Sequence, residues 1–544
     1  MKLILITGRD DVFIGQLIAK FHDICGVEFQ DVIYWKRKRR PLENLKKNIK
    51  KHGFIYLPYR IGLACGKLLN SWVKGVIDRI FLAPPIVEDI ERACQTRNIR
   101  VHEIEDIHSP EGVALVRELN ADVMAVCGTG ILRRSIFDLP RLGTINLHQG
   151  DALKYRGAPP GFWELWNSEP EVGVTIHFVD DGVDTGDIIL QDSLPIFDYD
   201  TVPSVQAKLN EASLRLYESA IKQLVSGDYA RIKQPQGVGK KYTYPTLYQS
   251  LRLYLKLIRH RFSIIEILRV KEIAYLISFC LLRFFNLARI KKNSGVLSVL
   301  YYHRVTNVCQ DAMTLDIDEF ERQIRFLKKN YWLISSNELL EWCDQAEFPM
   351  LAHRHACLIT FDDGYEDNFV NALPILRKYQ CPAIFFVSTG LIGNERQFPH
   401  DSQLQPRLAF RKMTWNNLKQ AVEEDVEIGV HTETHADLGS VPYENAIQEI
   451  ENSMRAYETQ LGRPAMVMSY PFGGRHNITP AVREYVRGSR DIRLLFAAYG
   501  GLNLGSIDPY NIKRINVGTK DRGPIFWFKT ENGSSMGRSS SQPK

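Results

Sequence analysis

The chain has 544 residues, of which 44% are hydrophobic and 24% charged, a composition typical of a soluble globular protein with roughly two to four domains. The net charge of +6 is unevenly spread: residues 34–53 carry nine Lys or Arg against one Glu, and residues 248–292 carry ten against two. Two local patches exclude a general basic coat for nucleic acid, so we expect no DNA binding.

The nine cysteines form no C-x-x-C pair, which is typical of reduced thiols and predicts a cytoplasmic protein. The apolar run 3–7 is too short for a signal peptide and predicts a first strand. In the middle segment the longest uncharged apolar stretch, 273–282, falls well short of the roughly 20 residues of a spanning helix.

The N-terminal half reads as an alternating β/α pattern with a parallel sheet up to about residue 225. Strands are predicted over 1–7, 122–127 and 143–147, with a helix over 111–120. The stretch 8–15 lacks the G-x-G-x-x-G fingerprint, so no nicotinamide cofactor is expected.

Three polar residues are the candidate site of this half. Asn146 and His148 alternate to the same face of one strand, and Asp184 lies in a turn further on. Such residues, converging on a cleft, can stabilise an oxyanion and move a proton without a metal.

The motifs of this half, taken in order, resemble those of the folate-dependent formyltransferase family. They are G-T-I-N-L-H at 143–148, Y-R-G at 155–157, G-V-T-I-H at 173–177 and D-T-G-D at 184–187. The resemblance implies a Rossmann-like fold and 10-formyltetrahydrofolate as formyl donor. It further implies that Asn146 and His148 polarise the formyl carbonyl, that Asp184 orients His148, and that Arg156 and Gly157 contact the donor.

One loop departs from the family pattern, because residues 148–157 keep its length but lack two of its prolines. Gly150 adds backbone freedom, so we expect a more mobile loop and an altered donor affinity. The run 173–191 is most similar to the sugar N-formyltransferases of the family. A basic tRNA-gripping β-domain does not follow, which argues against tRNA as acceptor.

Residues 241–295 are predicted to form a basic amphipathic helical linker. Its basic part, 248–292, has two interpretations: a helical hairpin that packs the two domains together, or a peripheral contact with the anionic inner membrane. The expected domains are 1–240 (formyltransferase-like), 241–295 (linker), 296–520 (deacetylase-like) and 521–544 (disordered tail).

In the C-terminal half, an apolar strand ends in T-F-D-D-G at 360–364. Consecutive strand residues face opposite ways, so Asp362 and Asp363 need different roles or a bend. About 70 residues on, His431 and His435 are spaced for one face of a helical turn, where two imidazoles can share a metal. Two histidines and one carboxylate leave coordination positions open, as catalytic metal sites do.

These motifs, with S-Y-P-F-G at 469–473, resemble the polysaccharide deacetylase family over about 296–518. The resemblance implies a deformed (β/α)7 barrel. It implies that Asp363, His431 and His435 bind a divalent metal, zinc being favoured, and that Asp362 is the general base. The oxyanion is expected to lie against the backbone at Tyr470 and Pro471.

Two departures from that family concern proton transfer. The Arg that often precedes the third motif is missing, so Asp362 lacks its usual partner, and no His follows His476 to act as the general acid. An amide nitrogen still needs a proton to leave. His303, in a Y-H-R stretch that ends the first barrel strand as in a permuted branch of the family, is the predicted substitute.

The leading hypothesis joins both halves: an amino sugar is N-deacetylated, and the exposed amine is then N-formylated. Because reduced folates are cytosolic, the expected partner is a nucleotide-linked or lipid-linked amino sugar, in the cytoplasm or at the inner membrane surface. The alternative is a methionyl-tRNA formyltransferase-like protein with an accessory deacetylase domain, whose basic patches bind tRNA phosphate. Intact motifs in both halves argue against a non-catalytic scaffold.

Overall fold

The computed structural model describes residues 1–36, 78–86, 88–235, 237–258, 270–291, 295–345, 355–401 and 410–534. The chain divides into two compact units, each described below by itself: Met1–Ser71 with Ile86–Phe262, and Trp72–Pro85 with Ser263–Lys544. Among the described residues, no helix combines the length and the apolar character needed to cross a membrane. The basic patch predicted at 34–53 lies outside the described residues from position 37 onward.

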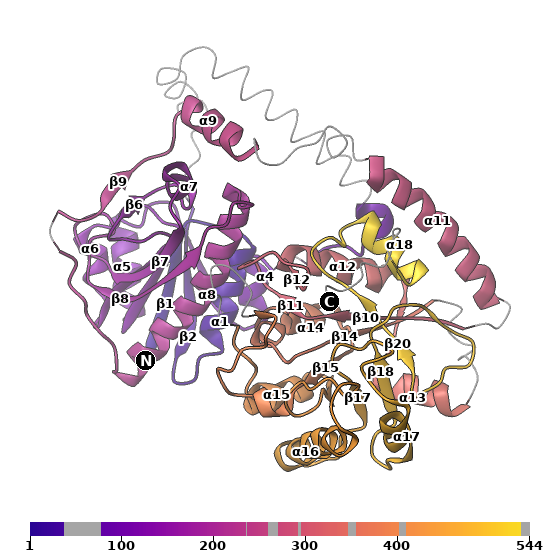
Figure 1. The fold of residues 1–544 in the computed structure, drawn as a ribbon. Coiled ribbons are helices and arrows are strands. Elements are labelled where there is room, and N and C mark those ends of the chain that lie inside the picture. The colour runs from indigo at the N-terminus through magenta and orange to yellow at the C-terminus, as the bar shows by residue number, and fades with distance from the viewer. Residues whose placement is uncertain are drawn as a thin grey trace. The chain divides into compact units, whose positions relative to one another are not determined.

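The first unit is built on a seven-stranded mixed sheet with the order β3-β2-β1-β4-β5-β7-β8 (Figure 1). The five strands from β3 to β5 are parallel, whereas β7 and β8 are antiparallel additions. Their bounds are β1 (Lys2–Thr7), β2 (Glu28–Trp35), β3 (Arg100–Ile104), β4 (Val123–Cys127), β5 (Gly143–His148), β7 (Glu171–Phe178) and β8 (Ile188–Pro195).

Helices and one small extra sheet complete this unit. The first strand, β1, is almost wholly buried, as expected for a parallel strand enclosed on both faces. The longest helix, α8, begins at a Thr201–Ser204 capping box and ends at Gly227 in the left-handed region. The elements are α1 (Val12–His22), α4 (Ile90–Gln95), α5 (Pro110–Leu119), α6 (Arg134–Phe137), α7 (Phe162–Asn167), α8 (Val202–Ser226), α9 (Leu247–Ile258), and the pair β6 (Tyr155–Gly157) and β9 (Lys240–Tyr242).

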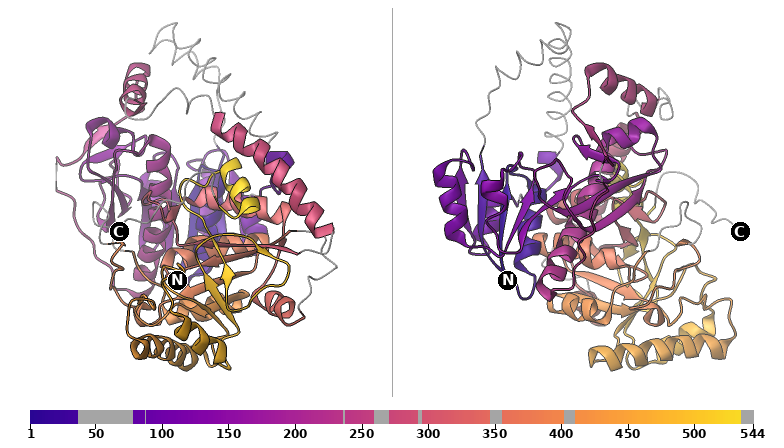
Figure 2. Two further views of the ribbon diagram at one scale, coloured as in Figure 1. Left: turned by 45° about the vertical axis from the view of Figure 1, so that its right-hand side comes forward. Right: turned by 90° about the vertical axis from the view of Figure 1, so that its left-hand side faces the viewer.

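The second unit is a barrel-like sheet of parallel strands with helices around it (Figure 2). The sheet closes at residues 512–516, because β20 pairs with β18 while β21 pairs with β10, and only Arg514 separates the two short strands. The parallel strands are β10 (Val296–Tyr302), β13 (Trp332–Leu333), β14 (Ala356–Phe361), β15 (Ala383–Val387), β16 (Val426–Val430), β17 (Val467–Ser469), β18 (Leu494–Ala497), β20 (Ile512–Lys513) and β21 (Ile515–Asn516). The predicted fold class of both halves is confirmed.

The remaining elements lie at the ends and outside of the barrel. An antiparallel strand, β19, adds to β10, and β11 pairs with β12. Their bounds are β11 (Arg304–Val305), β12 (Thr314–Leu315), β19 (Asn503–Leu504), α11 (Val270–Lys291), α12 (Ile317–Asn330), α13 (Ser336–Gln345), α14 (Leu373–Tyr379), α15 (Trp415–Glu423), α16 (Tyr443–Leu461), α17 (Pro480–Gly488) and α18 (Pro524–Asn532), with short helical turns Asn368–Ala372 and Thr389–Leu391.

Three predicted boundaries differ from the structure. The 241–295 linker is not a separate body, because α9 belongs to the first unit and α11 to the second. Residues 78–85, expected in the first domain, belong to the second unit, where the Phe81 ring centroid lies 4.8 Å from that of Trp527 and Asp78 pairs with Arg322 at 2.9 Å.

The tail expected to be disordered from 521 instead contains α18, which packs along α11 (Figures 1 and 2). Its residue Glu531 is buried and accepts hydrogen bonds from Asn286, Tyr331 and Arg283 and contacts His355. The composition of this segment did not reveal the helix, because the apolar cluster at 525–528 is short and a Gly/Ser-rich sequence follows it. Residues 535–544 lie outside the described chain.

Replacing Glu531 by Ala is expected to lower the free energy of unfolding of this unit by about 3–5 kcal/mol, because Arg283 and His355 lose a buried partner. Burial alone would raise the pKa of Glu531, but His355 and the hydrogen bonds of Tyr331 lower it to about 2 from 4.5. The stabilisation is therefore present above pH 4.5 and lost as the pH falls toward 2. The free energy of unfolding, measured with urea from pH 7 to 3, tests this prediction. The control is Glu484→Ala, at an exposed position. Equal loss of stability in the two variants would contradict the role of Glu531.

Candidate functional site

Two adjacent carboxylates follow β14, the strand that pairs with β10. Asp362 and Asp363 are both buried at the carboxyl end of the barrel strands. The bend that their adjacency requires is present, because Asp363 has φ 75° and Gly364 has φ 72°, both in the left-handed region. The two side chains can therefore face one site from consecutive positions.

The three predicted metal ligands come together in the structure. The Asp363 Oδ1 atom lies 3.2 Å from Nε2 of His435 and 3.7 Å from Nε2 of His431, and one ligand atom from each of the three lies within 4.8 Å of the others. The expected helical turn is wrong, however. Residues 431–437 follow β16 as a loop, in which Thr432 and His435 adopt positive φ.

The arrangement fits a divalent cation. The Nδ1 atom of His431 donates to the carbonyl of Ser469 at 2.7 Å, which leaves Nε2 facing the site. Burial lowers the pKa of His431 to about 4, so its imidazole is neutral, as a ligand must be. The Oδ2 atom of Asp363 is buried and has no hydrogen-bond partner among the described residues. Two nitrogens and one carboxylate form a donor set typical of zinc-type metals.

The partner of Asp362 is Arg514, which the sequence analysis did not assign. The buried guanidinium donates to both carboxylate oxygens of Asp362, at 2.6 and 2.8 Å, and to Oγ of Ser469 at 2.6 Å. Burial alone would raise the pKa of Asp362, but Arg514 outweighs it and holds that pKa below its ordinary value. Asp362 therefore remains ionised and oriented. A fold-level signal did exist: Arg514 lies near the end of the resemblance at 296–518, where the last strand of a closed barrel lies beside the first.

His303 follows β10, beside the strand carrying the two aspartates. Its Nδ1 atom is buried without a hydrogen-bond partner among the described residues. Burial lowers its pKa, while Asp363 and Asp362 act in the opposite direction, so all three groups lie within electrostatic range of one another.

The third motif follows β17, where the Ser469 carbonyl holds His431. Tyr470 is fully buried, and its hydroxyl donates to the carbonyl of Gly473 at 3.1 Å. Pro471 follows it and is likewise buried. Phe472 is half exposed, with its ring centroid 5.0 Å from that of His435. It forms an aromatic wall, which the sequence analysis missed, beside the predicted metal ligands.

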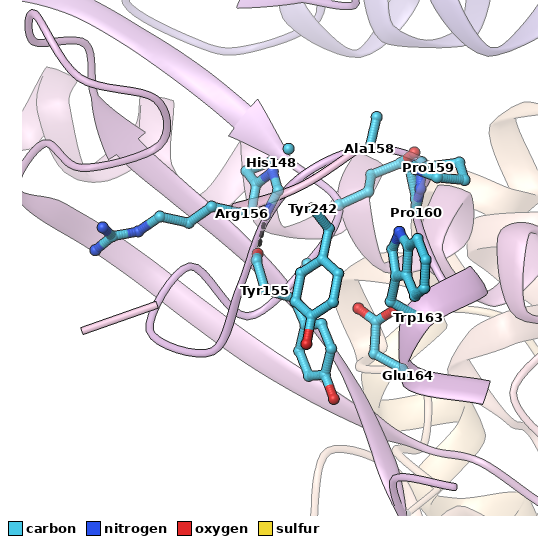
Figure 3. A pocket seen from close by; sticks show the side chains of 12 residues that line it. His148, Tyr155, Arg156, Ala158, Pro159, Pro160, Trp163, Glu164 and Tyr242 are labelled. Atoms are coloured by element: carbon cyan, nitrogen blue, oxygen red, sulfur yellow. Dashed lines mark hydrogen bonds between the residues drawn. The ribbon is translucent and has the colours of Figure 1, made fainter. Parts of the chain in front are cut away.

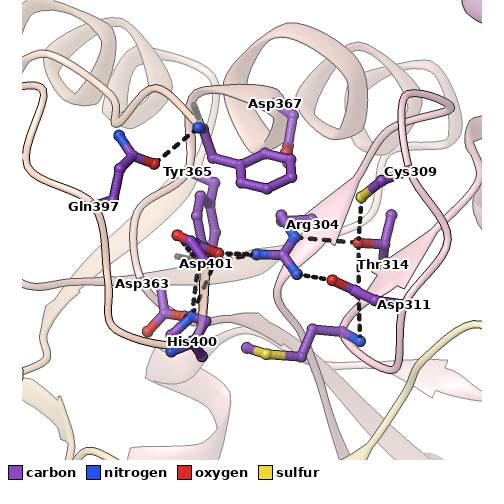
Figure 4. A network of polar contacts seen from close by, with 12 residues as sticks. Arg304, Cys309, Asp311, Thr314, Asp363, Tyr365, Asp367, Gln397, His400 and Asp401 are labelled. Atoms are coloured by element: carbon purple, nitrogen blue, oxygen red, sulfur yellow. Dashed lines mark hydrogen bonds and ion pairs between the residues drawn. The ribbon is translucent and has the colours of Figure 1, made fainter. Parts of the chain in front are cut away.

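A polar network lies beside Asp363 (Figure 4). The hydroxyl of Tyr365 lies 2.9 Å from Nε2 of His400, and that same nitrogen lies 3.7 Å from Oδ2 of Asp363. Tyr365 also donates to Asp401, which pairs with the buried Arg304. These contacts connect Arg304 and Asp401 through Tyr365 and His400 to the side of Asp363. Neither His400 nor Asp401 stands in a motif that would reveal it in the sequence.

The predicted site of the first unit also converges. Asn146 and His148 lie on β5, and both reach Asp184: Nδ2 of Asn146 is 3.5 Å from Oδ1, and Nδ1 of His148 is 3.4 Å from Oδ2. His177, a residue not assigned from sequence, pairs with Asn146 across β5 and β7. Its Nε2 lies 3.2 Å from Nδ2 of Asn146 and 3.5 Å from Asp184. His177 was not assigned because its position opposite Asn146 depends on the antiparallel register of β5 and β7, which cannot be read from the sequence.

Asp184 is the centre of that cluster. It adopts φ 55° and accepts a hydrogen bond from the backbone N–H of Gly157 at 2.9 Å. Burial alone would raise the pKa of Asp184, but His177, His148 and the Gly157 amide lower it to about 2. The carboxylate is therefore ionised at neutral pH and fixed by groups from three different segments.

A small pocket lies beside His148, with Tyr155, Trp163, Glu164 and Tyr242 in its wall (Figure 3). The Nε2 atom of His148 lies 2.7 Å from the carbonyl of Tyr155. Nε2 donates to that carbonyl, while Nδ1 faces Asp184 at 3.4 Å. Burial lowers the pKa of His148, and Asp184 acts in the opposite direction.

The two residues expected to contact the donor also line this pocket. The Arg156 side chain donates to the carbonyl of Ala152 at 2.9 Å and to Gln234 at 2.7 Å, so it holds the loop. Gly157 has φ 90°, and a Cβ there would lie 2.4 Å from the Tyr242 carbonyl, which requires glycine.

Gly150 has a steric role beyond backbone freedom, because a Cβ at this position would lie 2.6 Å from Nε2 of His148. Gly150→Ala is expected to displace the held imidazole and to lower formyl transfer by about 10- to 100-fold. Initial rates with a formyl donor and an amino sugar measure this. Gly488→Ala, where nothing lies within 4 Å of a Cβ, is the control; equal rates for both variants contradict the steric role.

Comparison with known proteins matches these two sites to two families. A family model described as formyl transferase matches residues 89–221, and one described as polysaccharide deacetylase matches residues 352–487. The chain joins a formyl transferase domain to a polysaccharide deacetylase domain. Both resemblances found in the sequence are thereby confirmed.

Curated relatives match the first of these domains. The methionyl-tRNA formyltransferase of Methylacidiphilum infernorum is 33% identical over 150 residues, 27% of this chain and 47% of the relative. That of Pelotomaculum thermopropionicum is 35% identical over 150 residues, 27% of this chain and 48% of the relative. The chain thus spans about half the length of these relatives.

Solved structures resemble each domain. IcaB from Ammonifex degensii is 22% identical and covers 44% of this chain and 96% of its own, with a TM-score of 0.35. A sugar N-formyltransferase from a Shewanella species is 19% identical and covers 47% of this chain and 88% of its own, with a TM-score of 0.30.

Proposed function

We propose that the protein is a bifunctional carbohydrate-modifying enzyme, which removes the N-acetyl group of an amino sugar and then formylates the exposed amine. The observation that carries the proposal is the presence, in one chain, of a carboxylate–imidazole metal site beside the Asp362–Arg514 pair and of the Asn146–His148–Asp184 cluster. The product of the first site, a free amine, is the substrate class of the second.

In the deacetylase site, Asp363, His431 and His435 hold the divalent metal, for which zinc is favoured. When bound, it supplies a Lewis acid that polarises the amide carbonyl and an attacking water. Asp362, ionised and fixed by Arg514, accepts the proton that the water loses. The backbone N–H of Tyr470, between the His431 partner Ser469 and Pro471, donates to the oxyanion.

His303 delivers a proton to the departing amine. Its lowered pKa keeps it neutral at first, so it must receive a proton, which Asp362 has just accepted, before it donates. His303→Ala is expected to lower deacetylation by about 100-fold or more while leaving metal content unchanged. Turnover together with metal analysis measures this; full turnover in the variant contradicts the role.

In the formyltransferase site, Asn146 and the Nε2–H of His148 donate to the formyl oxygen of 10-formyltetrahydrofolate. His148 does so once the Tyr155 carbonyl has moved aside. Asp184 orients His148 and takes up the proton that the attacking amine loses, and this proton then passes to the folate nitrogen that departs as the bond to the formyl carbon breaks. Arg156 and Gly157 shape the loop against which the donor lies.

The proposed acceptor is a nucleotide-linked or lipid-linked amino sugar, and the proposed location is the cytoplasm, where reduced folates occur. The most direct test is metal analysis of the purified protein with a deacetylation assay on small N-acetylated sugars. Bound metal with release of acetate supports the proposal, and a metal-loaded protein that releases none from any of them contradicts it.

A second candidate is a tRNA-acting formyltransferase with an accessory deacetylase domain. The observation that favours it is the 33% to 35% identity with proteins named methionyl-tRNA formyltransferase. Tight tRNA binding that weakens steeply between 50 and 200 mM salt, on the order of 10³-fold or more, together with formylation of methionyl-tRNA, would favour this candidate.

A further inference from the structure

Helix α11 has one face buried and one face bare. On the buried face, Phe279 is fully covered, Asn286 donates to Glu531 at 2.7 Å, and Arg283 pairs with Glu531 at 3.0 Å. These contacts, all to the second unit, fix the rotation of the helix about its axis. The packing therefore keeps the opposite face of α11 turned away from the core of the second unit.

The outward face of α11 is apolar along four turns. Phe284 is 70% exposed, and exposed residues recur at helical spacing along this face. Every exposed residue between positions 274 and 288 is uncharged, and they are Ala274, Ile277, Cys280, Leu281, Phe284, Phe285 and Leu287. A contiguous patch of this kind on a folded protein marks an interaction surface.

Helix α9, in the first unit, likewise has one side that contacts its own unit and one exposed apolar side. Lys256 donates to the carbonyl of Leu165 and to Oγ of Ser168, and Arg252 lies over the ring of Trp166, so one side of α9 is tied to its own unit. The other side exposes an apolar and aromatic set, which comprises Tyr248, Leu251, Tyr254 and Leu255.

Charge decides among the partners that such faces fit. The sequence of α11 has Lys271 beside Glu272 near its start and Arg289 and Lys291 near its end. Over 248–292 the sequence holds ten Lys or Arg against two Glu. Apolar faces with exposed Tyr and Phe, within so basic a stretch of sequence, match the boundary between anionic lipid head groups and acyl chains, whereas two copies of this basic stretch would repel each other.

We propose that the exposed faces of α9 and α11 bind the surface of an anionic lipid bilayer, with Phe284 and its neighbours inserted below the head groups. Each compact unit then carries its own lipid-binding helix, one on either side of the boundary near residue 262. The proposal does not depend on either enzymatic activity, because vesicle binding needs no substrate.

Flotation of the full-length protein with vesicles tests the proposal. Vesicles of phosphatidylcholine with 30% phosphatidylglycerol are expected to bind the protein at least about ten-fold more strongly than pure phosphatidylcholine vesicles, and 0.5 M NaCl is expected to weaken binding. If the protein binds neither the anionic nor the pure phosphatidylcholine vesicles, the proposal is overturned.

The double variant Leu281→Asp with Phe284→Asp is expected to reduce binding to the anionic vesicles by at least about ten-fold, because it places charge on the inserted face. Tyr443→Asp changes an exposed aromatic residue of α16 in the same unit and is expected to bind as wild type does. Equal binding by all three proteins overturns the proposal. The proposal is also overturned if the wild-type protein is a dimer, the double variant is a monomer, and neither binds vesicles. In that case the exposed face joins two copies of the chain.

Discussion

Replacing Asp363 by Ala is expected to abolish metal retention and to lower deacetylation by on the order of 10³-fold or more. Asp363 supplies the carboxylate of the donor set, and its Oδ2 atom has no protein hydrogen-bond partner among the described residues. Two imidazoles alone, His431 and His435, retain a divalent cation poorly. Metal content after dialysis and acetate release from an N-acetylated amino sugar are the two measurements.

Arg514→Lys is the matched comparison for that prediction. Lysine keeps the charge but not the paired hydrogen bonds to Asp362, so the variant should retain metal and still lose turnover by about 10- to 100-fold. Metal loss in one variant and not in the other separates coordination from proton transfer. If Asp363→Ala retains metal and turnover, the assignment of the C-terminal site is wrong.

The second large effect is expected for Asp184→Asn, which should lower formyl transfer by about 10²- to 10⁴-fold. In the proposed mechanism, asparagine removes the charge that orients His148 and the group that takes up the amine proton, while it keeps the shape of the site. Because the pKa of Asp184 is about 2, the wild-type carboxylate is ionised over the whole working pH range. Loss of this group therefore produces a decrease that raising the pH cannot reverse.

The control for this variant is Asp181→Asn, at an exposed position of the same turn, where the side chain pairs with surface Arg134. Rates with 10-formyltetrahydrofolate and an amino sugar are compared, and melting temperatures show that both variants fold. A wild-type rate for Asp184→Asn would remove the carboxylate from the mechanism.

Sequence patterns located the candidate residues but not the backbone geometry that brings them together. The T-F-D-D-G motif at 360–364 located both aspartates, but only the structure shows that positive φ at Asp363 turns them into one site. The spacing of His431 and His435 suggested a helical turn, whereas left-handed residues in a loop bring them together. The same spacing of the two histidines occurs in a helical turn and in a loop, so the sequence could not distinguish the two conformations.

Partners from distant segments were the residues missed. Arg514 is 152 positions from Asp362 and meets it only because the barrel closes at β20 and β21. His177 faces Asn146 through an antiparallel register of β5 and β7. Such pairs depend on topology, and no local pattern encodes them. The same holds for α18, whose Glu531 is specified by contacts with residues far along the chain.

The central claim is that one site prepares the amine that the other site formylates. The most direct measurement is mass analysis of products after the wild-type protein meets nucleotide-linked or lipid-linked N-acetyl amino sugars together with 10-formyltetrahydrofolate. We predict an N-formyl sugar from the wild-type protein, a free amine from Asp184→Asn, and unchanged N-acetyl sugar from Asp363→Ala. An N-formyl sugar absent for every form tried, while both half-reactions proceed on separate substrates, would contradict the coupling of the two sites.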